Sequence, residues 1–203
     1  PHNLYEKRFP AAKSLVSRPL ARFDGKIVVG DEEIDIEGWT GSQNHNWGRR
    51  HTDLYAWGQV AGFDGHPDTF LEIATARLKF GPFWTPPITP LVLRHDGREF
   101  SMTRLSRAVR ARGDFQCFEW DFATRDHDVE IAERISAPPE AFVGLAYPNP
   151  PGGVKHCLNS KIATCAVTIR ELGSGRLVRL TAQSRAAFEI LTDDRGHGVA
   201  IVA

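Results

Sequence analysis

The stretch LYAWGQVAGF (residues 54–63), with FLEIATARLKF (residues 70–80) after it, decides the fold class. A turn that contains Gly and Asp separates the two apolar runs at residues 64–68, which is the signature of a β-hairpin. Successive side chains of a strand point to opposite faces of a sheet. Residues 54–63 are therefore expected to carry one aromatic face with an embedded amide and one face of small apolar side chains.

The same pattern continues on both sides of this hairpin. Upstream, residues 20–29 and 34–38 flank a Gly- and Asp-containing turn. Further strand-like runs follow at residues 91–95, 99–103, 115–124, 129–135, 160–171 and 177–190. Helical periodicity is confined to a weak amphipathic pattern at residues 181–191. Many short strands joined by turn signals predict an all-β fold, and the succession of hairpins favours an antiparallel, lipocalin-like (calycin-type) β-barrel with little helix.

The first part of the chain differs in character from the rest. Residues 1–19 contain Pro1, Pro10 and Pro19 and show no periodic pattern. They are expected to form a linker or N-terminal arm, and residues 20–203 are expected to form the barrel domain. Because the chain begins with Pro1 rather than Met, we expect it to be a piece of a longer protein or a processed one.

Composition and charge exclude several classes of partner. The 25 basic and 25 acidic side chains give a formal net charge of zero, which removes the main electrostatic argument for nucleic acid. The arginine-rich run at residues 104–112 is interpreted as the solvated face of a strand. No stretch approaches the roughly 18 apolar residues of a transmembrane helix. The odd count of three cysteines predicts no disulfide framework and a reducing, cytoplasmic location.

The sequence contains few motifs that would indicate a cofactor or a metal ion. No Gly-rich phosphate loop, nucleophile elbow or dinucleotide fingerprint occurs, so no cofactor is expected. His45 and His51, with Asp53 nearby, are the best candidates for metal ligands. Their spacing matches no common metal motif, and no metal site is expected.

One acidic residue stands out on the predicted strands. Glu72 is the one charge on the even-numbered, apolar row of residues 70–80. A buried unpaired carboxylate is costly, so Glu72 is expected either to pair, for example with Arg77, or to have the raised pKa of an acid–base group. Trp120 belongs to another aromatic row, at residues 116–122. Such rows can line an apolar pocket or simply fill a barrel core.

The segment QNHNWG (residues 43–48) concentrates amide and imidazole groups beside an aromatic ring. Side chains of this kind bind ligands in fixed geometry, and a histidine can transfer protons near neutral pH. Residues 41–51 are expected to form a loop, and the alternative to a site is that this loop uses Asn and His only to satisfy backbone groups, with Trp47 capping the barrel. Spacing alone leaves both alternatives open.

Three segments together resemble a known family: GWTGSQNHNWG (residues 38–48), YAWG (residues 55–58) and YPNPPGGVKHCLNSK (residues 147–161). They resemble the AttH-like, hydroxyneurosporene-synthase-type proteins, which are similar to carotenoid 1,2-hydratases and tocopherol cyclases. The resemblance covers residues 20–203 and implies the C-terminal one of two lipocalin-like domains. It also implies binding of an isoprenoid, polyketide or other lipid-like molecule, with cofactor-free hydration or cyclisation in the enzymes. Only His45, Asn46, Trp47 and Gly48 carry over from the family pattern.

The leading hypothesis is a barrel that holds a hydrophobic small molecule. The expected ligand-binding residues are Asn46, Trp47, Tyr55, Trp57, Gln59 and Trp120, and the expected proton donor is Glu72 or His45. A non-catalytic carrier with the same cavity is the second hypothesis. The third is a structural barrel with a filled core, whose partner domain carries the site.

Overall fold

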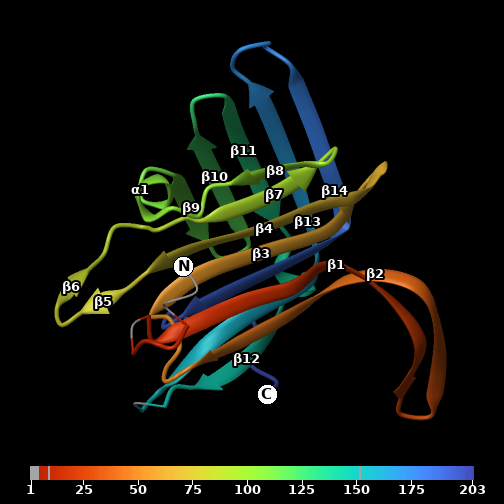
Figure 1. Ribbon diagram of the computed structural model, residues 1–203. Helices are drawn as coiled ribbons and strands as arrows, with labels where there is room; N and C mark the ends of the chain where they lie inside the picture. Colours follow the sequence, from red (N-terminus) through yellow and green to blue (C-terminus); the bar gives the residue numbers. More distant parts are fainter. Residues whose placement is uncertain (1–4, 9, 151) are drawn as a thin grey trace.

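The computed structural model describes residues 5–8, 10–150 and 152–203 of the chain, and most of these residues lie in antiparallel strands (Figure 1). The elements are β1 (Ala12–Val29), β2 (Glu32–Gly48), β3 (Leu54–Phe63), β4 (His66–Arg77), β5 (Lys79–Phe80), β6 (Phe83–Trp84), β7 (Leu91–His95), β8 (Arg98–Ser101), α1 (Leu105–Ala108), β9 (Arg112–Gln116), β10 (Glu119–Arg125), β11 (Val129–Ser136), the short helical turn η2 (Pro139–Ala141), β12 (Val143–Pro148), β13 (Val154–Glu171) and β14 (Leu177–Thr192). No helix among these elements is long and apolar enough to cross a membrane.

The main sheet follows the order β8-β7-β4-β3-β14-β13-β11-β10-β9, with β12 added alongside β13. Neighbours in this order are largely neighbours along the chain, and β14 pairs with β3 to join the two halves. The sheet curls so that β10 faces β4, where the Trp120 indole Nε1 donates to Thr75 Oγ1 at 3.2 Å. The fold class predicted from the hairpin pattern, a lipocalin-like antiparallel barrel with little helix, is confirmed in this curled half-barrel.

The core fills the concave, inner face of this sheet. The even positions of β3 and the odd positions of β4 point inward, and they meet large side chains from β10, β11 and β14. The fit is tight at Gly58, where an added Cβ would lie 2.4 Å from Ile135 Cδ1 and 3.2 Å from the Trp120 ring. Tight packing of this kind stabilises the fold but leaves no room for a ligand beside Gly58.

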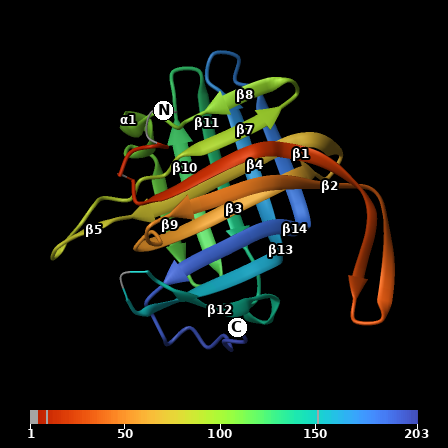
Figure 2. The ribbon, with the colours of Figure 1, turned by 60° about the horizontal axis from the view of Figure 1, so that its bottom comes forward.

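A long hairpin of β1 and β2 forms a separate two-stranded sheet. Figures 1 and 2 show it crossing one face of the main sheet near β3 and β4 and extending well past the sheet edge. Three register shifts interrupt the β1–β2 pairing, between Val16 and Arg18, Arg18 and Ala21, and Phe23 and Gly25. Such irregularities bend a ribbon and increase its twist.

This hairpin corrects two expectations about the start of the chain. Residues 41–51 were expected to be a loop, yet β2 continues to Gly48, and His45 and Asn46 pair with Leu15 and Ser14 of β1. Polar side chains are tolerated there because much of this two-stranded ribbon is exposed to solvent. β1 begins at Ala12, so the last part of the expected arm at residues 1–19 is strand. Association with a second lipocalin-like domain stays a prediction.

Two further segments differ from the expected pattern. Residues 104–112 contain the helical turn α1 before β9 begins, instead of one solvated strand face. The expected strand at residues 115–124 is divided by a tight turn at Cys117 and Phe118, and Phe118 has a φ of 78°. The weak helical pattern at residues 181–191 lies inside β14 and forms strand.

Candidate functional site

A cavity of about 610 Å³ lies on the outer face of the main sheet, beneath the base of the β1–β2 hairpin. Its lining residues are Ala12, Lys13, Ser14, Asn44, Asn46, Trp47, Gly48, Arg50, His51, Thr52, Tyr55, Trp57, Ala74, Ala76, Pro150, Lys161 and Glu189. They come from β1, β2, β3, β4, β13, β14 and two loops. A volume of this size is typical of small-molecule sites.

The strand sequences explain why space remains here. Tyr55 and Trp57 occupy odd positions of β3, which point away from the core. Across the ladder they face Ala76 and Ala74 of β4. Each large aromatic ring is thus paired with a methyl group, and the volume not filled by β4 is left open below the hairpin.

A carboxylate from β14 organises one wall of the cavity. The Tyr55 hydroxyl donates to Glu189 Oε1, and Asn159 Nδ2 donates to Glu189 Oε2 at 2.7 Å. Burial and the negative charge of Glu189 raise the pKa of Tyr55 far above its ordinary value, so its hydroxyl remains a donor. Glu189 was not identified from the sequence, because residues 181–191 gave only an ambiguous periodicity.

A second carboxyl, Glu72 of β4, lies beside the aromatic wall. The Trp57 indole Nε1 donates to Glu72 Oε1 at 3.1 Å. Burial raises the pKa of Glu72, and hydrogen bonds from Trp57 and Gln59 offset part of that rise. The alternative in which Glu72 pairs with Arg77 is wrong, because the Arg77 guanidinium donates to the Thr85 carbonyl at 3.3 Å and lies over the Trp84 ring. Within the described residues, Glu72 forms no salt bridge.

Gln59 connects this part of the sheet to the hairpin. Its side-chain oxygen accepts from Ser42 Oγ and from Asn44 Nδ2, the latter at 3.4 Å, and its Nε2 donates to Asn44 Oδ1 at 3.4 Å. Gln59 is 7% exposed. These reciprocal bonds fix β2 over β3 next to Glu72, so the hairpin is a wall of the site rather than a free arm at this point.

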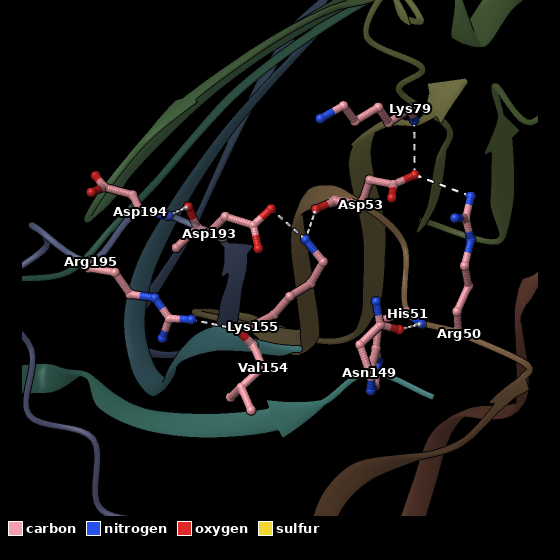
Figure 3. Close-up of polar contacts among 11 residues, drawn as sticks. Arg50, His51, Asp53, Lys79, Asn149, Val154, Lys155, Asp193, Asp194 and Arg195 are labelled. Atoms are coloured by element: carbon pink, nitrogen blue, oxygen red, sulfur yellow. Dashed lines mark hydrogen bonds and ion pairs between the residues drawn. The ribbon is translucent and has the colours of Figure 1, made fainter. Parts of the chain in front are cut away.

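A network of polar contacts holds the loop between β2 and β3 (Figure 3). Lys155 Nζ, which is almost fully buried, donates to the Asp53 carbonyl and to Asp193 Oδ2, both at 2.7 Å. The Asp53 carboxylate accepts from the backbone N–H of Lys79 at 2.9 Å and forms an ion pair with Arg50 at 3.5 Å. The network positions Arg50 and its neighbours in the loop at the cavity wall.

The expected site residues are distributed unevenly. Asn46, Trp47, Tyr55 and Trp57 line the cavity. Gln59 and Glu72 adjoin it through the contacts described above. His45 is exposed and stacks on Trp47, with ring centroids 5.2 Å apart.

Trp120 does not line the cavity, whereas His51 lines it but forms no metal-ligand cluster with His45 within the described residues. Trp120 is 1% exposed in the inner core, on the opposite face of the sheet. His51 packs against Tyr147, with ring centroids 5.1 Å apart. His45, His51 and Asp53 form no donor cluster within the described residues.

Comparison with known proteins gives distant matches only. The chain matches no protein-family model. It is 26% identical over 163 residues to an uncharacterized protein of Mycobacterium tuberculosis, found in strains CDC 1551 and H37Rv, and the match covers 80% of this chain and 49% of the relative. The chain thus spans about half the length of the curated relatives it matches.

Two solved structures are similar to this chain in the general arrangement of their strands. Kievitone hydratase from Nectria haematococca has a TM-score of 0.48 and 11% identity, over 86% of this chain and 51% of that protein. An AttH candidate from Nitrosomonas europaea has a TM-score of 0.40 and 11% identity, over 71% of this chain and 53% of that protein. Similarity at this level transfers neither a substrate nor a catalytic residue to this chain.

Proposed function

We propose that the chain binds an apolar small molecule with a polar end group in the cavity beneath the hairpin. The observation that carries this proposal is the cavity of about 610 Å³ with Tyr55 and Trp57 on one side and Ala74 and Ala76 on the other. Flat apolar groups of an isoprenoid or polyketide can lie over the methyl groups of Ala74 and Ala76, beside the aromatic rings of Trp57 and Tyr55. The Asn44 and Asn46 amides and the Glu189 cluster provide hydrogen bonds that orient the polar end.

The binding proposal is tested by filling the cavity. Ala74→Trp places an indole in the space opposite Trp57, whereas Ala132→Trp adds the same group at an exposed position of β11 and is the matched control. The probe is 1-anilinonaphthalene-8-sulfonate, whose fluorescence rises in apolar sites. We expect Ala74→Trp to weaken probe binding at least tenfold and Ala132→Trp to leave it unchanged. Equal binding by both variants would reject this cavity as the site.

Native mass spectrometry of the purified chain, followed by organic extraction, examines the same proposal from the ligand side. A lipid-like molecule that is retained by the unaltered chain and by Ala132→Trp, but lost from Ala74→Trp, would assign the ligand class directly. A molecule retained by all three proteins would place binding elsewhere.

We further propose that Glu72 acts as a general acid on an alkene of the bound molecule. The raised pKa of this half-buried carboxyl, with no salt bridge, favours a protonated form that can donate. The proton passes to one alkene carbon, water adds to the cationic carbon, and a proton of that water returns to Glu72. The electron-rich face of Tyr55 stabilises the intermediate cation, whereas Lys161 Nζ already lies over the Trp57 ring, 5.5 Å from its centroid.

The catalytic step is tested with geraniol, an isoprenoid alcohol with alkene groups, in isotopically labelled water. Hydration adds one labelled oxygen to the product, which mass spectrometry detects. We expect Glu72→Gln to abolish the labelled product while probe binding is preserved, because the amide still accepts from Trp57 Nε1. Unchanged turnover by Glu72→Gln, or none by the unaltered chain, would leave the carrier function and reject the catalytic one.

A further inference from the structure

A second cluster of chemistry-bearing side chains lies at the end of the sheet where two hairpin turns meet. β4 begins at His66, directly after the β3–β4 turn, and β7 ends at His95, directly before the β7–β8 turn. The antiparallel pairing of β4 with β7, through Phe70 and Arg94, brings the two turns side by side. Asp96 occupies the second turn with a φ of 48°. None of these residues lines the cavity beneath the hairpin.

The three side chains converge with the spacing of metal ligands. One ligand atom each from His66, His95 and Asp96 can be chosen so that all lie within 4.8 Å of one another. His95 Nε2 and Asp96 Oδ2 are 3.4 Å apart, and the two imidazole centroids are 5.0 Å apart. Two ligands about 2.1 Å from a tetrahedral zinc ion lie roughly 3.4 Å apart, and two ligating imidazole centroids lie about 5 Å apart. Both measured separations agree with a shared ion.

A hydrogen bond outside the cluster orients the buried histidine. His95 is 5% exposed, and its Nδ1 lies 2.9 Å from Thr69 Oγ1. When Nδ1 carries the proton and donates to that hydroxyl, the lone pair of the ring is on Nε2, which faces Asp96. Histidine ligands of zinc commonly donate their second nitrogen in this way to a fixed acceptor.

We propose that His66, His95 and Asp96 form a Zn²⁺ site. Two imidazoles and one carboxylate are a donor set that zinc accepts, and three protein ligands leave a fourth position for water or a ligand. An open depression of about 530 Å³ adjoins the cluster and is lined in part by His66 and Asp96. The fourth position therefore faces accessible space, as in zinc sites that bind exchangeable molecules.

One cation competes with zinc for this site. Arg176 Nη2 lies 3.6 Å from Asp96 Oδ2. Its guanidinium holds the carboxylate near the histidines without metal, and it opposes the ion by charge repulsion. Removing it is therefore expected to increase zinc affinity, a result that a purely structural role of the cluster does not predict.

The test is isothermal titration of the metal-free chain with zinc sulfate. We expect one equivalent of Zn²⁺ per chain, affinity at least tenfold lower in His66→Ala and in Asp96→Asn, and affinity several-fold higher in Arg176→Ala. Asn tolerates the positive φ at position 96. His127→Ala, at an exposed turn between β10 and β11, is the matched control and should bind like the unaltered chain.

Cobalt supplies a readout of geometry. Co²⁺ in a four-coordinate site gives strong visible absorption, which should appear in the unaltered chain and be lost in Asp96→Asn. Zinc binding that is equal in His66→Ala, Asp96→Asn and His127→Ala would overturn the proposal. Loss of binding in His156→Ala alone would overturn it too, since His156 and His197 form a separate pair with ring nitrogens 2.7 Å apart.

Discussion

The two faces of β3 and β4 have opposite characters although the same strands supply both. On the inner face, Gly58 is so closely packed that a larger residue would require the Ile135 side chain to shift. On the outer face, Trp57 stands opposite Ala74, and a cavity remains. The inner face stabilises the barrel and the outer face offers space and hydrogen-bonding groups. The space open to a small molecule therefore lies on the outer face, under the hairpin, where the proposed function requires it.

The largest effect is expected from the inner-face carboxyl Glu133 of β11. Neither of its oxygens has a hydrogen-bond partner in the described structure, and burial raises its pKa to about 8. Between about pH 4.5 and 8, the unfolded chain has lost this proton and the folded chain still holds it. The free energy of unfolding therefore falls as pH rises through that window, by up to about 5 kcal/mol.

Urea unfolding at a series of pH values measures this effect. Glu133→Gln should remove most of the decline and make the protein more stable than the unaltered chain at pH above about 8. Glu130→Gln, on the opposite face of the same strand, is the control and should keep the decline. A profile for Glu133→Gln that follows the unaltered chain would show that Glu133 is hydrated or paired.

The next prediction compares the loss of unfolding free energy when one tryptophan on each face is replaced by alanine. Trp120→Ala opens a cavity in the inner core and removes the donor to Thr75, so it should cost about 3–5 kcal/mol of unfolding free energy. Trp57→Ala removes a half-buried ring beside an existing cavity and should cost less than half as much. Urea unfolding at one pH measures both. Equal costs would contradict the contrast between a packed and an open face.

Sequence periodicity predicted the strands that became β3 and β4, but it did not predict which face of a strand points into the core. The alternation at residues 54–63 correctly separated Tyr55 and Trp57 from the small residues, because the side-chain period of a strand is local. Whether the aromatic face of a strand points into the barrel depends on distant partners. Trp120 shows the difficulty: its row resembled a pocket wall, and it fills the core.

Long-range pairing explains the other differences as well. Asn44, His45 and Asn46 resembled a loop because their strand exists only through pairing with β1. Cys157 and Cys165 are an even number of residues apart, a spacing that would put both on one face of an unbroken strand. A bulge between Ser160 and Ala163 shifts the register, so that Cys157 pairs with Leu191 on the outer face and Cys165 with Ala182 on the inner one. The meeting of His66 with His95 likewise depends on the β4–β7 pairing.

The smallest expected effect sharpens the account of the outer face. Tyr55→Phe removes the hydroxyl that donates to Glu189 and leaves the Asn159 bond at 2.7 Å in place. Because one hydrogen bond to a charged group is lost, we expect the unfolding free energy to fall by about 1–2 kcal/mol. The carboxylate of Glu189 can still reach the cavity.

Probe binding by the same variant tests the role of Glu189 in the site. If Glu189 orients the polar end of a ligand, Tyr55→Phe should weaken probe binding although the aromatic ring is kept. Asn159→Ala is the matched comparison, since it removes the other donor without altering the aromatic wall. Weaker binding in Tyr55→Phe with unchanged binding in Asn159→Ala would assign the ligand contact to the hydroxyl. Equal loss in both would assign it to the position of the carboxylate, and no loss in either would remove Glu189 from the site.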